Sequence, residues 1–112
     1  SDFYIQEYYN KIKFEFNKLE SNGVKCRILC WYDDYIKYIE SDDYMKDRFI
    51  PLFYNDMKFN TIRELMLYDK NMNIKTNIEF FGPRCPDDDH PSKKCHRVIA
   101  DSIIKKIESE NI

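Results

Sequence analysis

The sequence has no long apolar run, no excess of one charge and no initiator methionine. No segment reaches the roughly 18 apolar residues of a membrane-spanning helix, and Ser1-Asp2-Phe3 does not begin a secretory signal. The formal net charge of −2 gives the chain no general attraction to nucleic acid or to an anionic membrane. We therefore expect no membrane or nucleic-acid partner, and a natural chain that extends upstream of Ser1.

Glycine is scarce, whereas aromatic residues, Lys, Asn and Ile are abundant. This bias is typical of an AT-rich genome, such as that of a phage, a virus or an AT-rich microbe. Hydrophobic residues make up 43% and charged residues 34% of the chain, which is a globular balance. With no repeat, low-complexity segment or linker, residues 1–112 are predicted to form one domain or part of one. The expected location is cytoplasmic, or virion-associated if the source is viral.

Hydrophobic periodicity predicts an α/β fold. Residues 3–20 repeat apolar side chains at helical spacing, on one face formed by Ile5, Tyr8, Tyr9, Ile12, Phe16 and Leu19. Gly23 suits the left-handed position after a helix. Residues 24–31 then alternate as a strand, with one face formed by Cys26, Ile28 and Cys30. Helix, glycine turn and strand in this order predict a strand parallel to its neighbours.

Further elements are predicted in the second half of the chain. Residues 32–57 are expected to cross one edge of the sheet. A helix should begin near Asn60, because Thr61-Ile62-Arg63-Glu64 fits a capping box, and its apolar face should be formed by Ile62, Leu65 and Met66. Residues 78–81 resemble a short strand, and Ser92 is a suitable N-cap for a last helix that runs to about Ser109. The inner face of this helix should be formed by Cys95, Val98, Ile99, Ile103 and Ile107.

The cysteines are expected to be reduced. Cys26 and Cys30 would lie about 13 Å apart along the predicted strand, which is beyond the reach of a disulfide. Both are predicted to be buried thiols.

The most informative stretch is Asp87-Asp88-Asp89-His90-Pro91-Ser92, which precedes a helix containing Ile99-Ala100. It resembles the last conserved block of the SGNH-type (GDSL-like) serine hydrolases, in which Asp and His lie in the loop before the final helix. The resemblance implies that Asp87 and His90 are the acid and base of a Ser-His-Asp triad. It also implies that the chain is the C-terminal half of a three-layer, doubly wound, parallel-sheet fold of the flavodoxin-like type.

The nucleophile of that family is missing. No serine stands in a Gly-Asp-Ser block, and the glycine and asparagine blocks of the oxyanion hole are absent too. A hydroxyl nucleophile needs an adjacent base, whose imidazole in turn needs a carboxylate on its other nitrogen. The expected function is therefore a hydrolase segment that acts on an ester substrate with a serine from an upstream half-domain or partner chain. No cofactor is implied.

Other readings of the same loop stay open. His90 could simply precede a helix in a solvated acidic loop. Zinc could be held by Cys85, His90, Cys95 and His96, but the Cys-x-x-Cys pair of common zinc modules is missing. The run Asp87-Asp88-Asp89 lacks the glycine and distal glutamate of a calcium loop. We expect no metal.

A substrate pocket is predicted at the end of the first strand. Ligand clefts of α/β sheets lie beyond the carboxyl ends of the strands, which selects Trp31, Tyr32 and Asp33. The aromatic residues of the first helix are expected to pack in the core. The alternative function is a non-catalytic binding or structural module that retains the fold, for example in a viral or phage particle.

Overall fold

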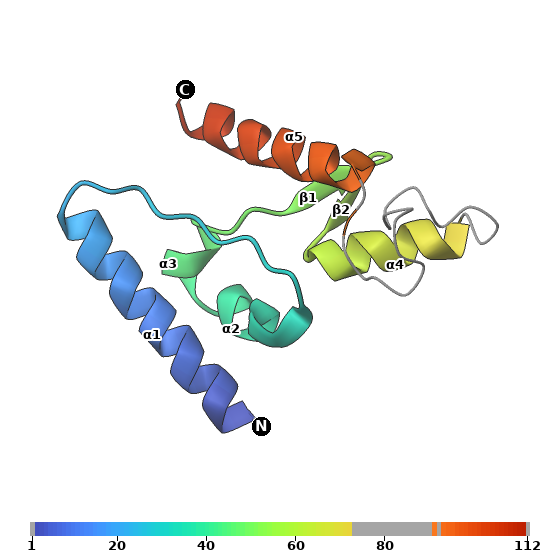
Figure 1. Ribbon diagram of the computed structural model, residues 1–112. Helices are drawn as coiled ribbons and strands as arrows, with labels where there is room; N and C mark the ends of the chain where they lie inside the picture. The colour runs from blue at the N-terminus through green and yellow to red at the C-terminus, as the bar shows by residue number, and fades with distance from the viewer. Residues whose placement is uncertain (1, 73–90, 92, 112) are drawn as a thin grey trace. The chain divides into compact units, whose positions relative to one another are not determined.

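The computed structural model describes residues 2–72, 91 and 93–111, which fall into two units, residues 1–50 and 51–112 (Figure 1). Unit 1 contains α1 (Asp2–Ser21), the 3-10 helix η1 (Asp33–Tyr35), α2 (Ile36–Glu40) and α3 (Asp43–Lys46). Unit 2 contains β1 (Leu52–Tyr54), β2 (Met57–Phe59), α4 (Ile62–Met72) and α5 (Lys93–Glu110).

The predicted fold class is wrong. In place of a three-layer parallel sheet, the described residues are mostly helical and hold one two-stranded antiparallel sheet. Residues 24–31 are extended as predicted, but they pair through a parallel bridge between Ile28 and Phe49 and form no sheet strand. Alternating burial is real along this segment. Alternating burial shows that one face of the extended segment is covered, and in this structure the cover is provided by helices rather than by further strands.

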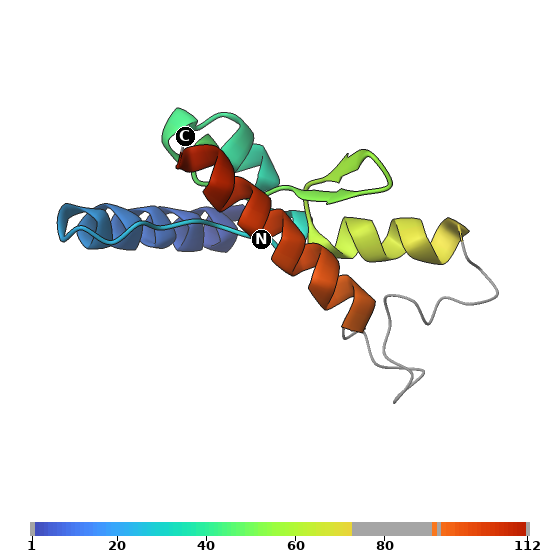
Figure 2. The same cartoon turned by 90° about the horizontal axis from the view of Figure 1, so that it is seen from above.

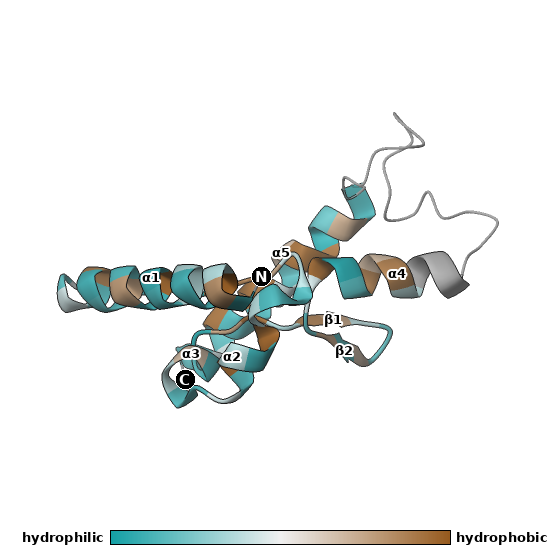
Figure 3. Ribbon diagram, turned by 90° about the horizontal axis from the view of Figure 1, so that it is seen from below, coloured by the Kyte–Doolittle hydropathy of each residue, from teal (hydrophilic) through white to brown (hydrophobic). Residues whose placement is uncertain are grey.

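The first helix is confirmed. Its end is fixed by Gly23, whose φ of 85° is the left-handed conformation predicted for it. Tyr9 is buried, whereas Tyr8 and Leu19, predicted for the same face, are 58% and 42% exposed. Brown apolar bands separated by teal polar ones run along α1 in Figure 3. The buried stripe of the helix is thus narrower than its apolar stripe.

The core of unit 1 lies where α1 and the short helices meet the extended segment. Its buried members are Tyr9, Ile28, Cys30, Ile39 and Met45. The segment is held by two backbone hydrogen bonds, from Ile28 N to Arg48 O (2.8 Å) and from Ile50 N to Ile28 O (2.9 Å). The predicted excursion after Trp31 therefore contains three short helices, and α2 and α3 contribute Ile39 and Met45 to this core.

The sheet of unit 2 is a tight hairpin (Figure 2). Its turn residues Asn55 and Asp56 have φ values of 53° and 61°, a conformation that Asn and Asp tolerate better than most residues. Leu52 pairs with Phe59, and both side chains are buried. The hairpin thereby gives unit 2 one apolar face.

The two long helices of unit 2 begin close to where the sequence predicts. Thr61 accepts a hydrogen bond on Oγ1 from Glu64 N at 3.0 Å, as expected of the N-cap residue of α4. The predicted inner face of α4 is confirmed, because Ile62, Leu65 and Met66 are buried. Of the face predicted for the last helix, Cys95 is fully buried, whereas Ile107 is 47% exposed.

Candidate functional site

The predicted catalytic pair lies outside the described residues. Asp87 and His90 both belong to residues 73–90, as do Cys85 and the predicted strand 78–81. The description resumes at Pro91, which is buried, and α5 begins at Lys93. What the structure gives for this site is therefore the helix that follows the Asp/His block.

That helix is fastened to the hairpin near its middle. Ser102 is 3% exposed and donates from Oγ to Val98 O at 2.8 Å. The same Oγ accepts a hydrogen bond from Phe53 N at 3.2 Å, so a serine on α5 satisfies a backbone donor of β1. Together with the fully buried Cys95, these contacts fix the position of α5 relative to β1.

The predicted substrate-binding residues adjoin a pocket in unit 1. The pocket has a volume of about 360 Å³ and is lined by Trp31 and Tyr32, but not by Asp33. The carboxylate at its edge belongs to Asp34, one residue further on in η1. The pocket lies beside an isolated extended segment rather than at a sheet edge, so the argument from parallel strands does not explain it.

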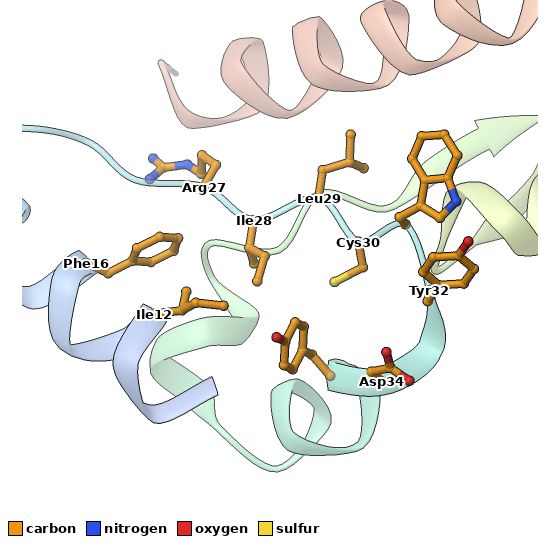
Figure 4. Close-up of a pocket in the computed structure, with 10 residues that line it drawn as sticks. Ile12, Phe16, Arg27, Ile28, Leu29, Cys30, Tyr32 and Asp34 are labelled. Carbon is orange, nitrogen blue, oxygen red and sulfur yellow. The ribbon is translucent and has the colours of Figure 1, made fainter. Parts of the chain in front are cut away.

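Three elements build this pocket (Figure 4). The first helix contributes Ile12 and Phe16, the extended segment contributes residues 27–32, and η1 contributes Asp34 and Tyr35. Ile28 and Cys30 point towards α1, whereas Leu29 projects from the opposite side of the segment, as alternation along an extended chain requires. The sequence predicted Ile12 and Phe16 as members of the core face of the first helix, because helical spacing does not distinguish a core face from a pocket wall.

The interior of the pocket is apolar and uncharged. Burial, and after it the nearby carboxylate of Asp33, raises the pKa of the Cys30 thiol to about 11, so the thiol is protonated at neutral pH. Arg27 donates from Nη1 to the carbonyl of Cys26 at 2.5 Å. Asp34, the acidic residue of the lining, is exposed to solvent. The charged groups that line the pocket are therefore a half-buried guanidinium and a solvent-exposed carboxylate.

A second cluster of functional groups joins the end of α1 to α3 and the residues after it. The Nε of Arg48 lies 3.0 and 2.8 Å from the two carboxylate oxygens of Glu20, and Tyr44 Oη donates to Glu20 Oε1 at 2.6 Å. The Arg48 guanidinium also stacks on the Tyr44 ring, 3.6 Å from its centre. Hydrogen bonds from Arg48 and then from Tyr44 lower the pKa of Glu20 to about 2. All the groups are satisfied by one another, so the cluster is structural.

Asp42 is the centre of a smaller polar cluster. Its Oδ2 accepts from Tyr9 Oη and from Lys13 Nζ, both at 2.9 Å, and its Oδ1 caps α3 by accepting from Tyr44 N at 3.1 Å. Burial alone would raise the pKa of Asp42, but the hydrogen bonds from Lys13 and Tyr9 outweigh it and hold the pKa below its usual value. Neither cluster was predicted, because the partners lie up to 33 positions apart and follow no periodicity.

The described residues contain no cluster that could bind the metals considered from the sequence. Within residues 2–72, 91 and 93–111, no three His, Cys, Asp or Glu side chains gather as a metal would require. Cys95 is fully buried and His96, the next residue, is exposed, so the two adjacent donors of α5 point to different environments. Cys85, His90 and Asp87-Asp88-Asp89 fall outside the described part of the chain.

Comparisons with known proteins add no relative. No protein-family model, curated protein or solved structure matches the chain. Among the described helices, none combines the length and apolar character needed to cross a membrane.

Proposed function

We propose that this chain supplies the Asp–His part of a Ser-His-Asp triad that hydrolyses a carboxylic ester. His90 would take the proton of a serine hydroxyl, and Asp87 would accept a hydrogen bond from the other imidazole nitrogen and stabilise the imidazolium. The serine would come from an upstream segment or a partner chain, because no serine of this sequence stands in a nucleophile motif.

The observation that carries the proposal is the anchored helix that directly follows the Asp-x-x-His-Pro-Ser block. α5 begins at Lys93, three residues after His90, and Pro91 between them is buried. A base that must meet a serine within hydrogen-bond distance gains from a neighbouring element that cannot shift. The contacts of Cys95 and Ser102 provide that fixation for α5.

The helical fold does not remove this function. Ser-His-Asp triads occur on unrelated folds and are recognised by the roles and geometry of three side chains. The helical fold does rule out the argument that the chain is half of a parallel-sheet hydrolase domain. The proposal is therefore supported only by the Asp/His block and by the helix that follows it.

The test is an ester-hydrolysis assay with and without a serine source. We expect this chain alone to be silent on p-nitrophenyl acetate, because it lacks the nucleophile. The protein that includes its upstream sequence should hydrolyse the ester, and His90→Ala should lower kcat at least about a thousandfold. His96→Ala, at an exposed position of α5, is the matched control and should leave the rate unchanged. Turnover by the isolated chain that disappears on His90→Ala would overturn the need for an external serine.

A second candidate is a non-catalytic binding module. It is favoured by the aromatic-lined pocket of unit 1, which is formed entirely by residues 12–35 and needs no catalytic partner. One observation distinguishes the two candidate functions, which is the presence or absence of a nucleophile motif in the reading frame upstream of Ser1. A Gly-Asp-Ser block there supports the hydrolase, and its absence supports the binding module.

A further inference from the structure

We propose that the pocket of unit 1 binds a neutral small molecule that carries an aromatic ring. The pocket lies wholly among residues 12–35, so this inference does not depend on the proposed triad. Its volume of about 360 Å³ falls within the range of about 300–1,000 Å³ typical of small-molecule sites.

The aromatic preference follows from the lining. Four rings border the pocket, and they come from α1, from the end of the extended segment and from η1: Phe16, Trp31, Tyr32 and Tyr35. Trp31 and Tyr32 stand at 52° to one another with ring centres 6.3 Å apart, so their ring faces point in different directions. Aromatic pairs prefer edge-to-face and offset geometries. A flat ring entering the pocket can meet such partners on several sides.

The preference for a neutral molecule follows from the charges. A buried ion needs a buried partner, since its lost hydration is otherwise uncompensated. The walls formed by Ile12, Phe16, Ile28 and the protonated Cys30 offer none. Among the lining residues, one half-buried guanidinium and one exposed carboxylate have opposite charges, those of Arg27 and Asp34. Neither an anion nor a cation is therefore favoured overall.

Phe16 and Ile12 show that the pocket is a built feature rather than a packing gap at a chain end. Both side chains belong to the middle of α1 and also pack against the buried core that contains Ile28 and Cys30. Their positions are thus fixed by the core of unit 1, and the pocket wall needs little reordering when a ligand enters.

The experiment uses a matched pair of fluorescent probes with the whole chain. N-phenyl-1-naphthylamine is neutral, and 1-anilinonaphthalene-8-sulfonate is the same ring system with an added anionic group. We expect the neutral probe to bind with one-to-one stoichiometry and the sulfonate to bind at least about tenfold more weakly. Trp31 is the single tryptophan and lines the pocket, so energy transfer from it to the bound neutral probe reports the site directly.

Two variants locate the binding. Ile12→Phe fills the pocket with an apolar side chain compatible with a helix, and should weaken binding of the neutral probe about tenfold or more. Tyr8→Ala removes an exposed ring of the same helix that does not line the pocket, and should leave binding unchanged. Far-ultraviolet circular dichroism checks that both variants fold. Trp31→Phe removes the only energy donor of the chain and should abolish energy transfer.

Several results would overturn the proposal, and each is independent of the triad. Absence of binding by the neutral probe to the wild-type chain would do so without any variant. Equal affinity for the two probes, or loss of binding in Tyr8→Ala but not in Ile12→Phe, would assign the signal to exposed apolar surface. Competition by tetramethylammonium would show that the rings form a cation site instead.

Discussion

The two units of the chain are stabilised by different kinds of polar interaction. Unit 1 ties its helices together with ionised groups, because Glu20 accepts hydrogen bonds from Arg48 and Tyr44, and Asp42 accepts from Tyr9 and Lys13. In the described part of unit 2 the buried polar side chains are those of Thr61 and Ser102, and neither is charged.

This difference follows from the elements available to each unit. Unit 2 has a hairpin with one apolar face, on which side chains such as Leu52 and Phe59 are covered. Unit 1 has three helices of five residues or fewer, which are too short to be stable through their own hydrogen bonds. The start of α3 is fixed by Asp42, which caps the helix and pairs with Lys13. The stability of unit 1 should therefore depend on pH more strongly than that of the described part of unit 2.

The largest expected effect comes from truncating the core of each unit. Met45 in unit 1 and Leu65 in unit 2 are both fully buried, and replacement of either by Ala should lower the free energy of unfolding by about 2–5 kcal/mol. If the units are separate cores, Met45→Ala should accelerate amide hydrogen exchange in residues 1–50 alone and Leu65→Ala in residues 51–112 alone. Acceleration of both halves by either variant would show that the division into two units is wrong.

A smaller effect is expected from acid. The folded-state pKa of Glu20 is about 2, below the value of about 4.3 for an unfolded glutamate. Its contribution is therefore present at neutral pH and is lost as pH falls from about 5 to about 2. Trp31 fluorescence during urea unfolding reports unit 1, and its midpoint should fall over this range, whereas hydrogen exchange in unit 2 should show no matching loss of protection.

Two substitutions on α1 sharpen that result. Glu20→Gln should lower the stability of unit 1 at neutral pH and flatten its acid dependence, because the amide carries no charge to lose. Glu15→Gln alters an exposed glutamate of the same helix and should leave the profile unchanged. An acid transition that survives Glu20→Gln would assign the pH response to other carboxylates.

Local signals predicted the elements, whereas partners distant in the sequence decided the fold. The helix over residues 3–20, the stop at Gly23 and the cap at Thr61 each depend on neighbours within four positions, and all three are confirmed. The predicted parallel sheet required neighbouring strands, and the alternating pattern of one segment does not identify which residues pair with it. Residues 24–31 show the expected alternating burial, yet helices supply the cover.

The candidate sites divide in the same way. Of the predicted substrate-binding residues, Trp31 and Tyr32 line a pocket and Asp33 does not. Phe16 and Tyr35 complete the lining from elsewhere in the chain. Nothing in the local pattern marks those two as pocket residues. The assignment of Asp87 and His90 depends on a short motif and stays a prediction.

The smallest expected effect separates backbone conformation from packing at the turn after α1. Gly23 has a φ of 85°, and a Cβ added there would meet no atom within 4 Å. Gly23→Ala should therefore cost about 1 kcal/mol purely because a side chain disfavours the left-handed conformation. Gly23→Asn should cost less, since asparagine tolerates that conformation better. Urea unfolding followed at Trp31 measures both, and the loss should appear in unit 1 alone. Equal losses for the two variants would mean that the turn tolerates only glycine for a reason other than φ.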